Sequence, residues 1–126
     1  MIPKCKQTEN RVSNLENANV YSIEEQRIGT WVNGKTLYRK VVQFLMPENP
    51  NGQQDVWVTI PHGISNIEEI AQYNIIWLWN NTFFSLPDAD VVPSTKISME
   101  NIELFKHYLI SGTLVTVTIE YTKTTD

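Results

Sequence analysis

The side chains of this 126-residue chain that could act in catalysis stand apart from one another. The two histidines are His62 and His107, and neither has a cysteine or a second histidine at the spacing of a zinc site. His62 lies between a proline and a glycine, which favours a turn residue over a catalytic one. The single cysteine, Cys5, lies in a polar N-terminal segment and is expected to be a solvent-exposed thiol with no redox or metal role.

The acidic residues give no stronger sign of catalysis. Within Glu24-Glu25 and within Glu68-Glu69 the adjacent side chains diverge, and no other spacing suggests the carboxylate pair of a glycosidase. Asp88-x-Asp90 could offer two oxygen ligands to calcium, but further donors in register are missing, so solvated turn aspartates are favoured. The chain also has no phosphate-binding glycine loop and no nucleophile elbow. We therefore predict a protein that is not an enzyme and that has no cofactor and no metal site.

The tryptophans are the better candidates for binding residues. There are four of them: Trp31, Trp57, Trp77 and Trp79. Trp77 and Trp79 share one face of an expected strand at i, i+2, and Trp57 lies on the polar face of its own strand. An outward indole offers a flat apolar surface and one N–H donor, which suits stacking on a sugar ring or filling a subunit contact. Three alternatives follow: all four are core residues, they fill a subunit interface, or Trp57, Trp77 and Trp79 bind a ligand.

Charge and hydropathy exclude two classes of partner. The net charge is −4 and the basic residues are scattered, with Arg39-Lys40 the only adjacent pair in the body of the chain. Duplex-DNA binders depend on clustered Lys and Arg, so we expect no nucleic-acid partner. No apolar run approaches the roughly 18 residues that span a bilayer, and the N-terminus lacks the pattern of a secretion signal. We expect a soluble protein that does not insert into membranes.

The clearest local structure is predicted around Asn33-Gly34. This pair separates two runs rich in β-branched and aromatic residues, a pattern typical of a two-residue type I′ hairpin. Antiparallel strands are therefore expected over 27–32 and 35–46.

Further strands are predicted over 55–60, 71–79, 82–86, 101–110 and 113–121, with loops at 46–54 and 87–95 and a short helical turn at 65–70. Helical spacing is an alternative over 101–110, but the turn residues Ser111-Gly112 that follow favour a strand. In the last strand, Val, Ile and Tyr alternate with a second face that carries Thr116, Thr118 and Glu120, which should meet water or a polar interface.

About seven short strands separated by turns predict an all-β fold, a β-sandwich that is jelly-roll-like. The expected organisation is a polar leader over 1–20, ordered at most against another copy or a partner, followed by one domain over 21–126.

Three separate stretches of the chain resemble a single family. The first stretch contains Tyr21-Ser22-x-Glu24-Glu25-Gln26, Gly29-Thr30-Trp31-x-x-Gly34-Lys35 and Tyr38-Arg39-Lys40. The second is IPHGISNI over 60–67, and the third is EYTKTTD over 120–126. In this order they resemble a module found in structural proteins of tailed bacteriophages and prophages, and they bracket 21–126.

The resemblance implies a β-rich domain at the distal or C-terminal end of a tail-fibre, head-fibre or baseplate-type protein. It does not imply an activity. Fibre proteins of this kind are usually threefold, so it also implies a homotrimer in contact with other virion proteins, assembled in the cytoplasm of a host bacterium and located in the virion.

The leading functional hypothesis is a fibre-tip or decoration domain that binds carbohydrate on the host surface. The alternative is a purely structural capsid or baseplate decoration, or a trimerisation domain, with no host ligand. A third hypothesis is a carbohydrate-binding module of a protein that degrades the host wall.

Overall fold

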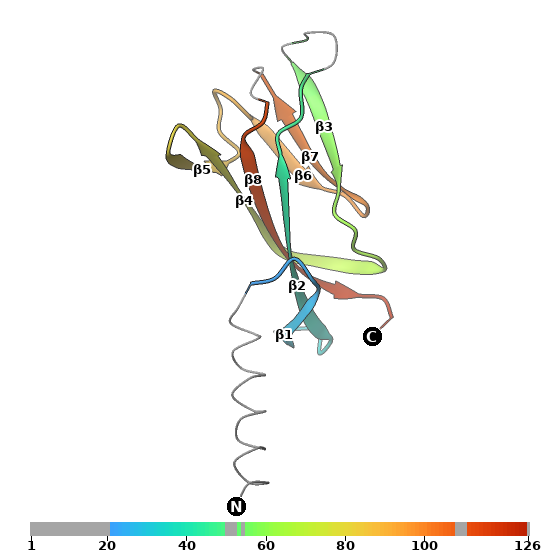
Figure 1. The fold of residues 1–126 in the computed structure, drawn as a ribbon. Coiled ribbons are helices and arrows are strands. Elements are labelled where there is room, and N and C mark those ends of the chain that lie inside the picture. Colours follow the sequence, from blue (N-terminus) through green and yellow to red (C-terminus); the bar gives the residue numbers. More distant parts are fainter. Residues whose placement is uncertain (1–20, 50–52, 54, 108–110, 126) are drawn as a thin grey trace, which may run out of the picture.

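The computed structural model describes residues 21–49, 53, 55–107 and 111–125, and within these ranges it contains eight strands and no helix. The strands are β1 (Gln26–Thr30), β2 (Thr36–Leu45), β3 (Val56–Pro61), β4 (Ile67–Trp79), β5 (Thr82–Leu86), β6 (Ser94–Ile97), β7 (Asn101–Lys106) and β8 (Leu114–Lys123). They form a five-stranded antiparallel sheet, β1-β2-β8-β4-β5, and a three-stranded one, β3-β7-β6, which lie as two layers (Figure 1). The prediction of an all-β sandwich is confirmed. The expected leader over 1–20, with Cys5, lies outside the described residues.

The core forms between the two layers because the inward faces of their strands are apolar. In β8, the alternating Val115, Val117, Ile119 and Tyr121 are all fully buried, as the sequence predicted. They pack in one cluster with side chains of the three-stranded sheet such as Leu104. Each fully buried aliphatic side chain of this kind contributes about 1.5–3 kcal/mol to folding.

The strand pairing is nested along the chain. β2, near the start of the chain, pairs with β8 at its end. β3, the next strand in sequence, pairs with β7, the strand before β8. This is the pairing of a jelly roll. β5, however, folds back onto β4 in the same sheet, which leaves five strands in one layer and three in the other.

The β1–β2 hairpin is present, but its predicted type I′ turn is wrong. The Trp31 amide donates to the Lys35 carbonyl at 2.8 Å, and the Gly34 amide donates to the Trp31 carbonyl at 2.9 Å. Of the Asn33-Gly34 pair only Gly34 has a positive φ, of 86°. The connection is therefore a three-residue loop that ends in a left-handed glycine. The two-residue turn with positive φ at both positions lies instead at Asn80-Asn81, with φ of 52° and 58°, between β4 and β5.

The predicted helical turn over 65–70 is also wrong, because β4 begins at Ile67 and runs unbroken to Trp79. The Ile67 side chain is 3% exposed and belongs to the core, so tertiary burial outweighs the local helix-capping signal. The register of β4 against β8 shifts at two points, between Ile67 and Glu69 and between Ile70 and Gln72. Such bulges bend a strand, and β4 turns sharply near its start in Figure 1.

The region predicted as a loop over 87–95 contains more structure than expected. An isolated bridge joins Asp88 to Val92, and β6 starts at Ser94 and pairs with β7. β6 has only four residues, too few to show a pattern in the sequence. The strand predicted over 101–110 is present as β7, and 108–110 lie outside the described residues.

One end of the sandwich is closed by a cluster that we call the basal clasp, formed by Glu25, Tyr121 and Lys123. The Tyr121 hydroxyl donates to one Glu25 carboxylate oxygen at 2.6 Å, and the Lys123 ammonium lies 2.7 Å from the same oxygen. Nearby, the Asn66 carbonyl accepts a hydrogen bond from the Thr124 amide at 2.8 Å. The clasp thus ties the segment before β1 to the end of β8, at the end of the molecule where the C-terminus lies (Figure 1).

Electrostatics makes the clasp sensitive to acid. Burial of the Glu25 carboxylate favours its protonated form, but hydrogen bonds from Lys123 and Tyr121 outweigh this and hold the pKa of Glu25 below its ordinary value. Burial, with the hydrogen bond to Glu25, raises the pKa of Tyr121 well above its usual range. The folded state therefore prefers an ionised Glu25 beside a protonated Tyr121.

The substitution Gly34→Ala should destabilise the protein by about 1–2 kcal/mol, because it places a Cβ at a left-handed position. Denaturant unfolding measures this. Gly29→Ala is the matched control, since Gly29 lies in β1 outside the left-handed region and an added Cβ meets no atom within 4 Å. Equal unfolding midpoints for the two variants would contradict the loop conformation.

The substitution Glu25→Gln should lower stability at neutral pH and flatten its dependence on pH. Because the pKa of Glu25 is lowered by folding, its contribution is complete above its unfolded pKa of about 4.3 and disappears as the pH falls through the folded value. Wild type should lose stability more steeply than Glu25→Gln below about pH 4.5. Unfolding midpoints measured from neutral pH into the acid range, for wild type and variant, test the effect. Glu24→Gln removes the same charge at the neighbouring position, outside the clasp, and is the control. A curve for Glu25→Gln parallel to that of wild type would overturn the role of the clasp.

Candidate binding surfaces

The outer face of the three-stranded sheet presents the first candidate surface. Alternation along β3 turns Val58 inward to the core and Trp57 outward, where Trp57 is 44% exposed. Its cross-strand partner in β7 is Phe105, and the two ring centroids lie 5.3 Å apart. The predicted outward position of Trp57 is confirmed.

Polar groups border this aromatic pair. The Lys96 ammonium lies over one face of the Trp57 ring, 4.5 Å from its centroid, and the His107 and Phe105 rings make a T-shaped contact with centroids 5.5 Å apart. The Nδ1 atom of His107 is 2.7 Å from a carboxylate oxygen of Asp55. We call these five residues the Trp57 platform. An exposed indole beside a carboxylate, an imidazole and an ammonium can stack on the apolar face of a ring and hydrogen-bond to groups at its rim.

The structure separates Trp77 from Trp79 although both lie on one strand face. Trp77 is 1% exposed and its indole N–H donates to the Thr113 hydroxyl at 2.9 Å, so it is a core residue. Trp79 is 47% exposed and stacks on Trp77, with centroids 5.7 Å apart and planes 12° from parallel. Trp77 therefore supports Trp79 and offers almost no surface to a ligand itself.

The four tryptophans do not form one site. Trp57 packs with Phe105 on the three-stranded sheet, whereas Trp79 packs with Trp77 and Phe84 on the five-stranded one. The fourth, Trp31, donates its indole N–H to the Glu69 carboxylate at 3.2 Å. The alternative in which all four are core residues is wrong, because two of them are close to half exposed.

His62 is a buried, hydrogen-bonded residue of the irregular segment that follows β3. It is 2% exposed. Its Nδ1 accepts from the Ile64 amide at 3.1 Å, which leaves Nε2 to donate to the Ser98 carbonyl at 2.9 Å. The imidazole thus fastens the segment after β3 to the turn between β6 and β7.

The acidic residues considered as possible metal ligands or catalytic groups bind different partners in different parts of the fold. The Asp88 carboxylate accepts the Asp90 amide at 2.9 Å within its own turn, and Glu68 pairs with Lys35. Among the described residues, no group of three or more His, Cys, Asp or Glu is arranged to hold a metal ion. In the same part of the chain no helix has the length and hydropathy to cross a membrane.

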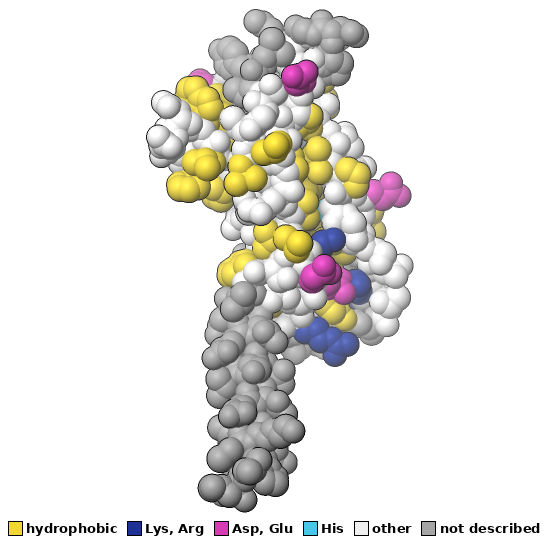
Figure 2. Space-filling model, viewed as in Figure 1, with side chains coloured by type: hydrophobic (Ala, Val, Ile, Leu, Met, Phe, Trp, Pro, Cys, Tyr) yellow, Lys and Arg dark blue, Asp and Glu magenta, His cyan; other side chains and the backbone are white. Residues whose placement is uncertain are grey.

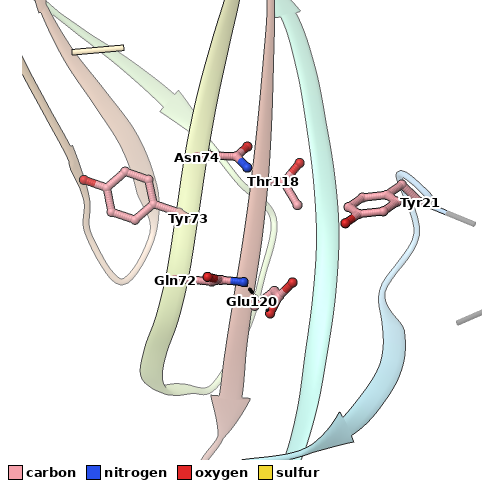
Figure 3. Close-up of a pocket in the computed structure, with 6 residues that line it drawn as sticks. All are labelled: Tyr21, Gln72, Tyr73, Asn74, Thr118 and Glu120. Carbon is pink, nitrogen blue, oxygen red and sulfur yellow. Dashed lines mark hydrogen bonds between the residues drawn. The ribbon is translucent and has the colours of Figure 1, made fainter. Parts of the chain in front are cut away.

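A small polar pocket on the outer face of the five-stranded sheet was not predicted (Figure 3). Its volume is about 130 Å³, and it is lined by Tyr21, Gln72, Tyr73, Asn74, Thr118 and Glu120. We call it the Tyr21 pocket. The sequence carried one sign of it, since the polar second face of the last strand, with Thr118 and Glu120, was expected to meet water or a polar interface.

The same outer face becomes apolar toward the turn between β4 and β5. Leu45 of β2 pairs with Leu114 of β8, and Phe83 of β5 pairs with Leu78 of β4. We call these four residues the apolar row. Leu45, Leu114 and Phe83 are 62%, 36% and 72% exposed. Hydrophobic side chains gather over this upper part of the molecule in Figure 2.

Comparisons with protein-family models, with curated proteins and with solved structures give no match for this chain. The assignment of a function therefore depends on the surfaces described above.

Proposed function

We propose that this chain is a non-enzymatic structural module of a tailed-bacteriophage virion, a fibre-tip or decoration domain that contacts carbohydrate on the host surface. The Trp57 platform is the observation that carries the proposal. Its indole is 44% exposed and packs beside the Phe105 ring, so the two residues form an aromatic surface on the outer sheet face.

The chemistry of the platform suits a sugar. The apolar C–H face of a pyranose can stack on the Trp57 indole, and the Phe105 ring, 5.3 Å away and tilted by 50°, extends the apolar surface beside it. Sugar hydroxyls both donate and accept hydrogen bonds, and the platform offers acceptors on Asp55 and donors on Lys96, whose ammonium lies over one face of Trp57. The platform is carried by paired strands, which keeps its aromatic residues in a fixed arrangement.

The three stretches that carry the resemblance to phage structural modules meet in the fold. Glu25 of the first stretch bonds Tyr121 of the third, and Lys40 of the first donates to the carbonyl of His62 in the second at 3.0 Å. Stretches that contact one another in this way belong to a single structural unit. Within the proposal, the unit lies in the virion, is assembled in the host cytoplasm and contacts other virion proteins.

The test is binding of wild type and Trp57→Ala to an array of bacterial surface glycans. Affinity should fall at least about 10-fold, because removing a central aromatic anchor costs on the order of 2 kcal/mol. Trp79→Ala, at an exposed indole elsewhere, is the matched control and should bind normally. Both variants must remain folded at the temperature of the binding assay, which thermal unfolding checks. Trp77→Ala is unsuitable, since removing a core indole costs about 3–5 kcal/mol. If wild type binds no glycan, or if Trp57→Ala binds normally, the Trp57 platform is not a glycan-binding site.

The second candidate function is structural, a decoration or trimerisation domain with no host ligand. The apolar row favours it, because exposed leucines and a phenylalanine in line across four neighbouring strands fit a contact between copies of the chain. A homotrimer is compatible with either candidate.

Light scattering after size exclusion should give three times the monomer mass. Replacing Leu45 and Phe83 by Ser should dissociate the assembly, because the exposed apolar surface that drives association is lost. Val32→Ser changes another exposed apolar residue, 90% exposed in the β1–β2 loop, and should leave the mass unchanged. A wild-type monomer would contradict the trimer, and an unchanged mass for the double variant would exclude the apolar row as its interface.

A further inference from the structure

We propose that the Tyr21 pocket binds one uncharged saccharide unit, at a site separate from the Trp57 platform. The two surfaces lie on outer faces of different sheets, and this proposal requires neither a phage origin nor binding at Trp57.

Strand register brings the polar side chains of the pocket together. β4 and β8 pair Asn74 with Thr118 and Gln72 with Glu120, so four polar side chains form two adjacent rows on one face. The register shift between Ile70 and Gln72 sets this arrangement, because one extra residue exchanges the inward and outward faces of a strand. Figure 3 shows these four side chains on the neighbouring ribbons of β4 and β8, with Tyr73 pointing away from them.

The Tyr21 side chain borders the pocket on the side where β2 lies (Figure 3). Its ring lies against the Arg39 guanidinium, 3.6 Å from the ring centroid, and the Val41 amide donates to the carbonyl of the next residue, Ser22, at 2.9 Å. The backbone at this point is thereby attached to β2. Tyr21 nevertheless remains 59% exposed, which leaves aromatic surface for a ligand.

Hydrogen-bonding capacity remains unused in the pocket. The Gln72 amide donates to one Glu120 oxygen at 2.9 Å. Within the described residues, three side-chain groups of the pocket make no hydrogen bond. They are the second carboxylate oxygen of Glu120, the side-chain carboxamide of Asn74 and the hydroxyl of Thr118. A carboxylate, a carboxamide and a hydroxyl on one sheet face supply both acceptors and donors, which matches the mixed donor and acceptor character of sugar hydroxyls.

Charge and size narrow the ligand class. The lining residues carry one carboxylate, that of Glu120, and no Lys, Arg or His. The neighbouring Arg39 is only 6% exposed and lies against the Tyr21 ring, so a uronic acid or a phosphate would meet the like charge of Glu120 first. The volume of about 130 Å³ is well below the roughly 300–1,000 Å³ of pockets for drug-sized ligands, and fits one ring rather than a long chain. The pocket therefore suits a neutral hexose or an N-acetylhexosamine.

The experiment is a titration of ¹⁵N-labelled protein, followed by amide NMR shifts, with glucose, galactose, N-acetylglucosamine, glucuronic acid and inorganic phosphate at millimolar concentrations. At least one neutral sugar should shift the amides around Asn74 and Thr118. Neither glucuronic acid nor phosphate should shift them. Asn74→Ala and Thr118→Val should each lower the affinity for the neutral sugar about 10-fold, the loss expected for one hydrogen bond.

Gln43→Ala is the matched control, because Gln43 lies on the same sheet face but outside the pocket, bonded to Thr116. It should bind the neutral sugar like wild type. A dispersed spectrum shows that each variant is folded. The proposal is overturned if no neutral sugar shifts the pocket amides, if glucuronic acid or phosphate shifts them equally, or if Asn74→Ala and Thr118→Val bind normally. Shifts confined to β3 and β7 would overturn the pocket while leaving the Trp57 platform intact.

Discussion

The central position of β8 is the constraint on which the rest of the structure depends. β8 pairs along its length with β2 on one side and β4 on the other, and its four inward apolar side chains are fully buried. A slip of one residue would bury Thr118 and Glu120 and expose Val117 and Ile119, so the register is strongly fixed. The outward side chains of the same strand are thereby fixed as well. The Tyr21 pocket is built on them, which makes it a consequence of core packing.

Tyr121 connects the core to the polar end of the molecule. Its ring is fully buried and stacks on Tyr38, with ring centroids 5.8 Å apart. Folding therefore removes the hydrogen bonds that the Tyr121 hydroxyl makes to water in the unfolded chain. The Glu25 carboxylate accepts that hydroxyl, and Lys123 balances the charge. Because an unpaired buried hydroxyl is costly, the packing of β8 requires an acceptor at this place. The segment before β1 supplies it, and its course also brings Tyr21 over β2.

What could be predicted from the sequence is what depends on local alternation. The inward face of β8 and the outward position of Trp57 follow from period-two patterns, and both are confirmed. The turn at Asn33-Gly34 was misassigned because a glycine after Asn satisfies a three-residue loop as well as a type I′ turn. The helical turn over 65–70 was misassigned because capping signals are local, whereas Ile67 is held by the core and by its pairing with Lys123. The Tyr21 pocket depends on a bulge and on a distant segment, and no single stretch of sequence encodes either.

The two surfaces on the five-stranded sheet can serve different partners at the same time. Leu114 of the apolar row and Thr118 of the Tyr21 pocket lie four residues apart on one strand, about 13 Å at the rise of a β-strand. A contact between copies centred on the apolar row would place the pocket at its border, where interfaces are polar and reached by water. The face changes from leucine and phenylalanine to threonine, asparagine and glutamate over this distance, which is the composition expected of a core and its rim. Association of copies would then shield the apolar row while leaving the hydrogen-bonding groups of the pocket open to a small solute. The opposite outer face, with the Trp57 platform, would remain free in such an assembly.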